Sequence, residues 1–224
     1  MQDKINIIRE SDAWFLRNKN YLEHAECSDG MKIFSTFYDQ CRQSVQIRQI
    51  LEVGCANGYN LMYMNKKYGI SGYGIDPSQK AVEYGNAFAE NERIPVALKQ
   101  GFADALPYEN ESFDMVYLGF CVYQFDRNAL FKAMSEADRV LSTGGFCVIT
   151  DFDTPTRYIR DNIHSSNIPT YKTDCSVFFL PYGYTLVEKR MYTHASKGFV
   201  PNIQERLSTQ ILYKEPSQNI YVRD

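Results

Sequence analysis

The segment from Ile50 to Gly58, with the sequence ILEVGCANG, constrains the fold of this chain more than any other. An apolar stretch carries an acidic residue near its end and leads into a glycine turn, and a helical pattern follows at once. A turn of this kind brings backbone N–H groups and a helix N-terminus against a ligand. The small residues stand at Gly54, Ala56 and Gly58, so the third falls one position earlier than in the G-x-G-x-x-G pattern of dinucleotide-binding proteins.

Strand and helix patterns alternate through the middle of the chain. Apolar strands are predicted at 47–53, 71–75, 96–99, 112–118 and 146–150, with helices at 59–68, 80–91 and 128–141 and a turn at 142–145. This alternation indicates an α/β fold, in which a mostly parallel sheet has helices on both faces.

The N-terminal part of the chain departs from the alternation. Residues 1–46 are polar with interleaved aromatic side chains, and they predict a helical cap ahead of a main domain at 47–224. Ser11 or Asp12 is expected to begin a first helix, and Ser28 or Asp29 a second; further along the chain, Ser78 is the candidate cap of the helix predicted at 80–91.

The C-terminal part departs from it in another way. Residues 185–192 and 206–214 read as strands with no helix between them, which indicates an antiparallel hairpin at the edge of the sheet. Residues 153–181 carry few regular signals, and a segment of this length is typical of a lid-like loop.

Charge and hydropathy exclude several classes of protein. The formal net charge is -3 over 224 residues, whereas a general nucleic-acid binder usually carries a basic face. No apolar run approaches the roughly 20 residues of a membrane span, and the first four residues, MQDK, lack the pattern of a signal peptide. We therefore expect a cytoplasmic protein that acts on a small molecule, with no nucleic acid and no membrane as partner.

Cysteine and histidine spacing argues against a metal site. The six cysteines form no C-x-x-C pair, which favours buried reduced thiols over disulfides or a zinc site. His24, His164 and His194 are far apart in sequence and make no local metal pattern. No metal is expected.

The turn motif resembles the first motif of class I S-adenosylmethionine-dependent methyltransferases, (Asp/Glu)-x-Gly-x-Gly-x-Gly, with Ala56 as a mild departure. The resemblance implies a Rossmann-like, seven-stranded, mostly parallel sheet with an antiparallel C-terminal hairpin. It also implies S-adenosylmethionine as the cofactor and S-adenosylhomocysteine as the product. Its cofactor-binding residues in this turn are Glu52, Gly54, Cys55, Ala56 and Gly58.

A second part of the resemblance lies at Asp76 and Pro77. An acidic residue at the end of the second strand, 22 positions after Gly54, stands where Rossmann-like folds bind a ribose, and a carboxylate accepts both ribose hydroxyl protons. The alternative is that Asp76 only caps the helix that follows.

Later motifs occur in the order that the family shows. The run GFADALP at 101–107 resembles a segment in which the family's aspartate takes the adenine amino group, which assigns Asp104 and its neighbour Ala103 to the cofactor. An ordinary turn aspartate is the alternative. The run SFD at 112–114 opens the fourth strand, whose end at Leu118 and Gly119 faces the cofactor in the family. The RVLSTGG segment at 139–145 resembles a structural turn of the family.

The N-terminal run containing Trp14, Arg17 and Asn18 is similar to the W-x-x-R-N stretch of a bacterial subgroup associated with surface-sugar biosynthesis. The resemblance implies that Arg17 or Asn18 pairs with the methionine carboxylate, and that Trp14 covers the sulfonium by a cation–π contact. The alternative is that Trp14 packs a helix onto the sheet while Arg17 stays solvated.

Candidate bases and substrate residues follow from position in the chain. Asp151 and Asp153 stand at the carboxyl end of the fifth strand, where ligands bind in open α/β sheets, and His164 and His194 are the other candidate bases. Tyr171, Lys172 and Asp174 are expected to meet a polar or anionic substrate, and the alternative is that they lie in a solvated loop. Tyr123 and His194 are the other expected substrate residues.

These patterns predict a methyltransferase that acts on an oxygen of a small polar acceptor, with a sugar or surface-polysaccharide precursor as the first substrate class. The alternatives are a methyltransferase of tRNA or protein, and a binding module that has lost turnover. A nicotinamide oxidoreductase is disfavoured by the glycine spacing. The sequence leaves open whether the protein is a monomer or a homodimer.

Overall fold

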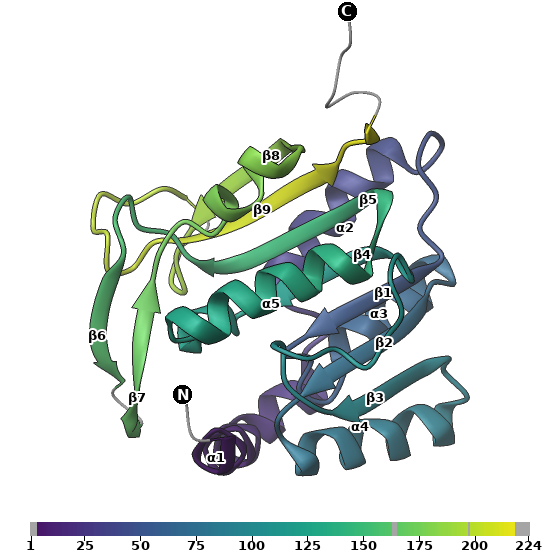
Figure 1. The fold of residues 1–224 in the computed structure, drawn as a ribbon. Helices are drawn as coiled ribbons and strands as arrows, with labels where there is room; N and C mark the ends of the chain where they lie inside the picture. The colour runs from purple at the N-terminus through teal and green to yellow at the C-terminus, as the bar shows by residue number, and fades with distance from the viewer. Residues whose placement is uncertain (1–3, 163–164, 197, 218–224) are drawn as a thin grey trace, which may run out of the picture.

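The computed structural model describes residues 4–162, 165–196 and 198–217. A seven-stranded sheet with the order β3-β2-β1-β4-β5-β9-β8 forms its centre (Figure 1). Strands β1 to β5 are parallel, and β9 pairs antiparallel with both β5 and β8. The strands are β1 Gln49–Val53, β2 Ser71–Asp76, β3 Val96–Gln100, β4 Phe113–Gly119, β5 Leu141–Phe152, β8 Tyr184–Tyr192 and β9 Leu207–Lys214. The predicted parallel sheet and its antiparallel strand pair are confirmed.

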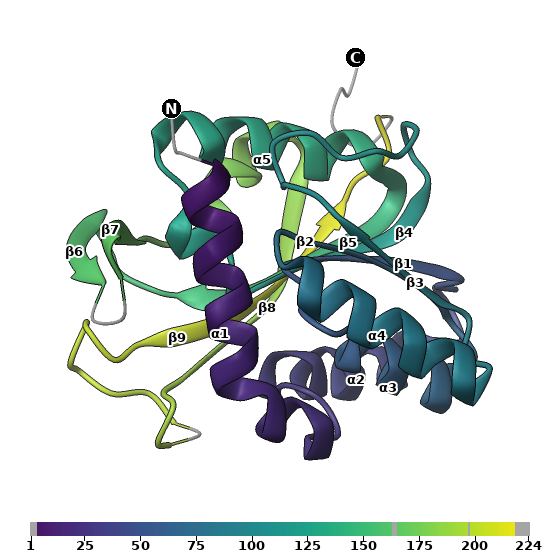
Figure 2. The ribbon, with the colours of Figure 1, turned by 90° about the horizontal axis from the view of Figure 1, so that it is seen from below.

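Helices cover both faces of the sheet. They are α1 Lys4–His24, α2 Asp29–Cys41, α3 Tyr59–Tyr68, α4 Gln79–Glu92 and α5 Arg127–Val140. Helix α5 packs on one face, and α2, α3 and α4 pack on the other, so that two hydrophobic clusters flank the strands. Helix α1 lies across the carboxyl ends of the central strands (Figure 2). Short 3₁₀ helices occur at η1 Val122–Gln124, η2 Ser176–Phe178 and η3 Leu180–Tyr182.

Serine side chains begin two of the helices, as the sequence predicts. Ser28 Oγ accepts a hydrogen bond from Met31 N–H at the start of α2, and Ser78 Oγ accepts one from Ala81 N–H at the start of α4. The predicted start of the first helix at Ser11 or Asp12 is wrong, because both residues lie inside α1. Asp12 instead accepts a hydrogen bond of 2.6 Å from Ser78 Oγ, which fastens α1 to the beginning of α4.

The segment predicted as an irregular loop at 153–181 contains a β-hairpin. Strand β6, Tyr158–Asn162, pairs antiparallel with β7, Ser165–Lys172, apart from the main sheet. Pro169 argues against a strand in the sequence. In a two-stranded hairpin, however, each strand has a free edge, where the missing N–H of a proline costs no ladder bond.

The start of β5 also differs from the prediction. Residues 142–145 were expected to form a turn, but β5 already begins at Leu141, which pairs with Phe113. The register then shifts, so that Met115 pairs with Phe146, and Gly144 in between has a φ of 83°. The glycines therefore provide an irregularity within one long strand.

Two other properties concern the described residues as a set. All six cysteines are free thiols. Between residues 4 and 217, apart from 163, 164 and 197, no helix combines the length and the hydropathy needed to cross a membrane.

Candidate functional site

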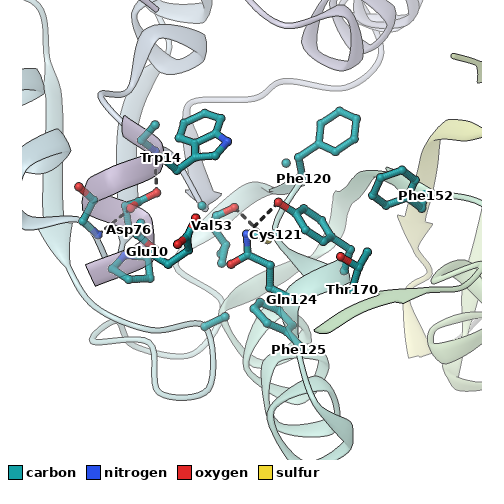
Figure 3. Close-up of a pocket in the computed structure, with 18 of the residues that line it drawn as sticks. Glu10, Trp14, Val53, Asp76, Phe120, Cys121, Gln124, Phe125, Phe152 and Thr170 are labelled. Carbon is teal, nitrogen blue, oxygen red and sulfur yellow. Dashed lines mark hydrogen bonds between the residues drawn. The ribbon is translucent and has the colours of Figure 1, made fainter. Parts of the chain in front are cut away.

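A cavity of about 1380 Å³ opens at the carboxyl ends of the parallel strands. Its walls come from α1, the β1–α3 turn, the ends of β2, β4 and β5, the start of α5, the β6–β7 hairpin and the β8–β9 connection. Figure 3 shows Trp14 and Asp76 on one side of the cavity, and Phe120, Phe152 and Thr170 on the other. Small-molecule sites usually measure about 300–1,000 Å³, so this cavity has room for a cofactor and an acceptor together.

The β1–α3 turn forms one wall through a run of left-handed residues. The φ angles of Gly54, Ala56 and Gly58 are 78°, 47° and 75°. A Cβ atom added at Gly54 would lie 2.8 Å from Cys121 Cβ, so the turn has no space for a side chain there. Ala56 adopts the left-handed conformation although L residues disfavour it, so the alanine takes a backbone conformation that glycine adopts readily.

The residues of this turn do not all reach the cavity. Glu52, Gly54 and Ala56 line it, whereas Cys55 is buried in the hydrophobic cluster beneath the turn and Gly58 packs beside Leu98. Cys55 and Gly58 therefore shape the turn from behind.

Asp76 at the end of β2 joins the turn to the next helix. Its Oδ2 accepts a hydrogen bond of 2.8 Å from Ala56 N–H, and its Oδ1 accepts one of 2.8 Å from Ser78 N–H. Burial raises the pKa of this carboxyl to about 6, although the two N–H donors oppose the shift. The carboxylate lines the cavity together with Pro77. Because a carboxylate has about four acceptor positions, two remain for a ligand's hydroxyl groups.

Glu52 is the most deeply buried acidic residue of the cavity wall, with 1 % of its surface exposed. Its Oε1 accepts a hydrogen bond of 2.7 Å from Asn60, while its Oε2 has no partner among the described residues. Burial raises the pKa of Glu52 to about 8, and the charge of Asp76 adds to the rise. A buried oxygen without a partner is costly, and a ligand donor would remove that cost.

The segment after β3 brings Ala103 and Asp104 to the same cavity. Asp104 forms an ion pair of 3.1 Å with Lys4 at the start of α1. The ion pair adds to the Asp12 contact in holding α1 against the strand ends, so that the helix becomes a wall of the cavity.

Trp14, Arg17 and Asn18 of α1 also line the cavity. Arg17 is already engaged by Glu10 through an ion pair of 2.8 Å, and Asn18 Nδ2 donates to the Trp14 carbonyl oxygen at 2.8 Å. A carboxylate ligand would therefore have to share Arg17 with Glu10.

Two residues at the end of β4, Leu118 and Gly119, are expected from the sequence to face the cofactor. Gly119 lines the cavity, but Leu118 is completely buried in the core beneath it. Tyr123 in η1 lines the cavity as well, and its hydroxyl accepts a hydrogen bond of 2.8 Å from Gln124. Burial raises the pKa of Tyr123 to about 12.

Two of the candidate bases lie behind the wall. Asp151 is buried and accepts hydrogen bonds from the N–H groups of Phe152 and Tyr123, and burial raises its pKa to about 7. Asp153 forms an ion pair of 2.6 Å with Lys189. Neither carboxylate is part of the cavity lining, and both have partners within the protein. His164 lies outside the described residues.

His194 is the candidate base that the structure brings into the cavity. Its ring stacks on Phe120, with centroids 5.6 Å apart and an interplanar angle of 25°. Partial burial and the charge of Lys172 both lower the pKa of His194 below its ordinary value of 6.5. The imidazole is therefore neutral at pH 7 and able to accept a proton.

The acceptor side of the cavity contains residues that sequence reasoning missed. Phe120, Phe152 and Arg160 line it, together with the predicted Lys172. The first two directly follow or end a strand, a position that could have identified them, but Arg160 lies in the unpredicted hairpin. Tyr171 stands outside this cavity, in a second one of about 380 Å³, and its ring contacts Arg157. Asp174 pairs with Lys189.

The comparison with protein families gives one match in the described chain. Residues 50–145, which contain the glycine turn, Asp76, Asp104 and the end of β4, match the model of the family described as "Methyltransferase domain".

Residues 50–145 carry a methyltransferase domain, and the fold around them is that of class I S-adenosylmethionine-dependent methyltransferases.

Curated relatives of this methyltransferase domain share part of its sequence. An uncharacterized methyltransferase, YcgJ, of Bacillus subtilis is 26 % identical over 123 residues, which cover 54 % of this chain and 46 % of the relative. A demethylmenaquinone methyltransferase of Staphylococcus aureus is 36 % identical over 113 residues, which cover 47 % and 44 %. The chain thus spans less than half the length of these relatives.

Solved structures show the same fold over almost the whole methyltransferase domain. A [4+2]-cyclase, SpnF, superimposes with a TM-score of 0.70 at 14 % identity and covers 96 % of this chain and 97 % of its own. A 1,6-didemethyltoxoflavin-N1-methyltransferase of Burkholderia thailandensis, with 1,6-didemethyltoxoflavin and S-adenosylhomocysteine bound, gives a TM-score of 0.70 at 12 % identity and covers 95 % of this chain and 89 % of its own. At these identities the likeness concerns the fold alone.

The residues of the cavity fit S-adenosylmethionine. Glu52 Oε2, which has no partner in the described part of the chain, could accept a hydrogen bond from an ammonium group, and Asp76 keeps acceptor positions for ribose hydroxyls. Asp104 offers a carboxylate to the same cavity as an acceptor for an amino group, and Trp14 presents an aromatic surface to it. These are the residues that would hold the cofactor.

Proposed function

We propose that the protein transfers a methyl group from S-adenosylmethionine to an oxygen of a small polar acceptor, with a sugar or surface-polysaccharide precursor as the substrate class. One observation carries this proposal. The three acidic residues of the cofactor motifs, Glu52, Asp76 and Asp104, line the same cavity as an aromatic and basic acceptor wall.

The cofactor supplies an electrophilic methyl group on a sulfonium. The chain's own contribution is to align this group with the acceptor and to keep water away. Asp76 fixes the ribose through its remaining acceptor positions, and Trp14 stabilises the positive charge. Helix α1 and the β6–β7 hairpin both contribute to the walls that exclude solvent.

A hydroxyl acceptor must lose its proton as the new bond forms. In the proposed step the carbon–oxygen bond forms while the carbon–sulfur bond breaks, and the hydroxyl proton passes to a ring nitrogen of His194. The lowered pKa of His194 keeps the accepting nitrogen free at pH 7. The stacking on Phe120 holds the imidazole at the acceptor side.

The size and lining of the cavity support a small acceptor. Aromatic rings of Phe120 and Phe152 offer flat apolar surfaces, while Lys172, Thr170 and His194 offer polar groups beside them. A few placed polar groups in an aromatic wall are typical of small-molecule sites. The net charge of -3 disfavours the alternative of a tRNA substrate.

A second candidate function is suggested by the structural comparison. The fold of a [4+2]-cyclase superimposes as well as that of a methyltransferase, with a TM-score of 0.70 in both cases. Since one fold hosts several functions, the alternative is a protein that binds the cofactor without transferring its methyl group.

Calorimetric titration with S-adenosylhomocysteine tests the proposal, with NAD as the comparison ligand. Micromolar binding of the first and none of the second is expected. Turnover is then followed as S-adenosylhomocysteine release with a panel of sugars and sugar phosphates. Failure to bind S-adenosylhomocysteine would refute the cofactor assignment. Binding without turnover on any sugar or other hydroxyl acceptor would favour the second candidate.

A further inference from the structure

The ammonium group of Lys172 is unusual among the charged groups of the cavity. Only 2 % of the residue is exposed, yet Lys172 lines the cavity from strand β7. Its Nζ donates a hydrogen bond of 2.7 Å to the carbonyl oxygen of Gln204 and lies 3.8 Å from the centroid of the Phe152 ring. No carboxylate of the described residues lies within 4.0 Å of it. A buried charge of this kind is costly unless it is paired.

Asp151 does not serve as the missing partner. Its charge and that of Lys172 influence each other, but the carboxylate oxygens accept backbone N–H groups of Phe152 and Tyr123. The pKa of Lys172 is lowered by burial and by the positive charge of Arg160, with Asp151 opposing the shift. This direction is the one expected for an ammonium that lacks an ionic partner.

Arg160 places a second positive charge beside the first. It stands opposite Thr170 in the register of the β6–β7 hairpin, and Thr170 is two residues before Lys172 on the same strand. Because residues i and i+2 of a strand share a face, Arg160, Thr170 and Lys172 point from one face of the hairpin, and all three line the cavity. Within the described residues Arg160 forms no ion pair.

The buried charges of the cavity are thus separated. The buried acidic residues Glu52 and Asp76 come from the ends of β1 and β2, whereas Lys172 and Arg160, which form no ion pair within the described residues, come from the hairpin. The other charged side chains near the hairpin side, Glu205 and Lys132, are exposed. The acidic side suits a cofactor that carries an ammonium and a sulfonium. The basic side suits an anion, because a charge-assisted hydrogen bond to Lys172 or Arg160 would replace the missing partner.

We infer that the acceptor carries an anionic group, a phosphate or a carboxylate, which Lys172, Arg160 and Thr170 bind at the hairpin side of the cavity. This inference rests on the proposed function and specifies its substrate class. The guanidinium and the ammonium neutralise the anion, the Thr170 hydroxyl donates a further hydrogen bond, and the remainder of the acceptor lies against Phe120 and Phe152.

The test uses the full chain and inorganic phosphate as the probe. Phosphate binding is measured by ³¹P NMR line broadening, first in the free protein and then with S-adenosylhomocysteine present. The variants are Lys172→Met and Arg160→Gln. Their matched controls are Lys99→Met, an exposed lysine whose ammonium also lies over an aromatic ring, and Arg157→Gln, which stands just before β6 outside the large cavity.

Each site variant is expected to weaken phosphate binding at least about tenfold, since hydrogen bonds to charged groups are worth that much, while both controls bind as the unaltered protein does. Glucose 1-phosphate should bind at least about tenfold more tightly than methyl glucoside for the same reason. Equal binding by the site variants and the controls would overturn the inference, as would absence of phosphate binding to the unaltered protein. Arg160→Gln keeps the test valid if Lys172→Met fails to fold, because Arg160 has no ion pair to lose within the part of the chain that the structure describes.

Failure of the proposed function gives a different result. It would appear as absent S-adenosylhomocysteine binding in the calorimetric titration, whereas phosphate binding to the free protein would still report on Lys172 and Arg160. A protein that binds the cofactor and not the anion would leave the methyltransferase proposal intact and remove only this inference.

Discussion

Glu52→Gln should make the ligand-free protein more stable at alkaline pH while weakening cofactor binding. The side chain is buried at the cavity wall, one of its oxygens has no hydrogen-bond partner among the described residues, and burial raises its pKa from 4.5 to about 8. Between pH 4.5 and about pH 8, the Glu52 carboxyl of the folded protein holds a proton that the unfolded chain has released. The free energy of unfolding therefore falls as the pH rises through this window. Glutamine has no proton to lose and keeps the same shape.

The size of the effect follows from the pKa. One pKa unit corresponds to about 1.36 kcal/mol, so the rise from 4.5 to about 8 amounts to at most roughly 5 kcal/mol. Between pH 5 and pH 8 the unaltered protein should lose roughly 3 kcal/mol of stability relative to Glu52→Gln, as an order of magnitude. An ammonium ligand at Glu52 Oε2 would offset this loss, so the variant should bind S-adenosylhomocysteine at least about tenfold more weakly.

Urea unfolding at pH 5, 6, 7 and 8 measures the free energy of unfolding of both proteins without ligand, and calorimetry measures the binding. Glu92→Gln, at an exposed position at the end of α4, is the matched control. Parallel pH profiles for the unaltered protein and Glu52→Gln would refute the reasoning. They would mean that the carboxyl group is solvated or paired in solution.

Three further changes have defined outcomes. Asp76→Ala should weaken S-adenosylhomocysteine binding by roughly 1.5–3 kcal/mol, the range for hydrogen bonds to charged groups, and a folded variant with full affinity would remove Asp76 from the ribose site. Since the pKa of Asp76 is raised to about 6, the unaltered protein should also lose affinity for this ligand below about pH 6. His194→Gln should lower turnover of a hydroxyl acceptor about 10²- to 10⁴-fold without changing cofactor affinity, and full turnover by this variant would show that another group is the base. The turnover rate of the unaltered protein should fall only below pH 6.5, because the pKa of His194 lies beneath that value. Asp12→Ala removes the acceptor for Ser78 Oγ and should lower the melting temperature by roughly 2–6 °C, whereas an unchanged melting temperature would mean that this contact adds nothing to the docking of α1.

The parts of the fold that the sequence predicts are those with local signals. The glycine turn, the helix from Tyr59 to Tyr68 and the caps at Ser28 and Ser78 depend on residues close in sequence, and the structure has all of them. The error at Asp12 has a local cause too. A capping side chain within a polar helix looks like a helix start, although Asp12 caps a different helix, α4, across space.

The acceptor side of the cavity was harder to predict because its residues meet only in three dimensions. Phe120, Arg160, Lys172 and His194 come from three separate segments: the end of β4, the β6–β7 hairpin and the β8–β9 connection. The hairpin that supplies two of them contains a proline and a shift of register, so its alternation is weak. The burial of Asp151 behind the wall also depends on β9, which pairs with β5 although it lies far along the chain from it.

Helix α1 and the β8–β9 connection enclose one cavity although they lie at opposite ends of the described chain. The binding surface is therefore complete only when β9 has paired with β5. Contacts between distant segments form slowly, and a partly folded chain would have the glycine turn without its acceptor wall. Any ligand that spans both sides links the two ends of the chain, so that its affinity measures the integrity of the whole domain.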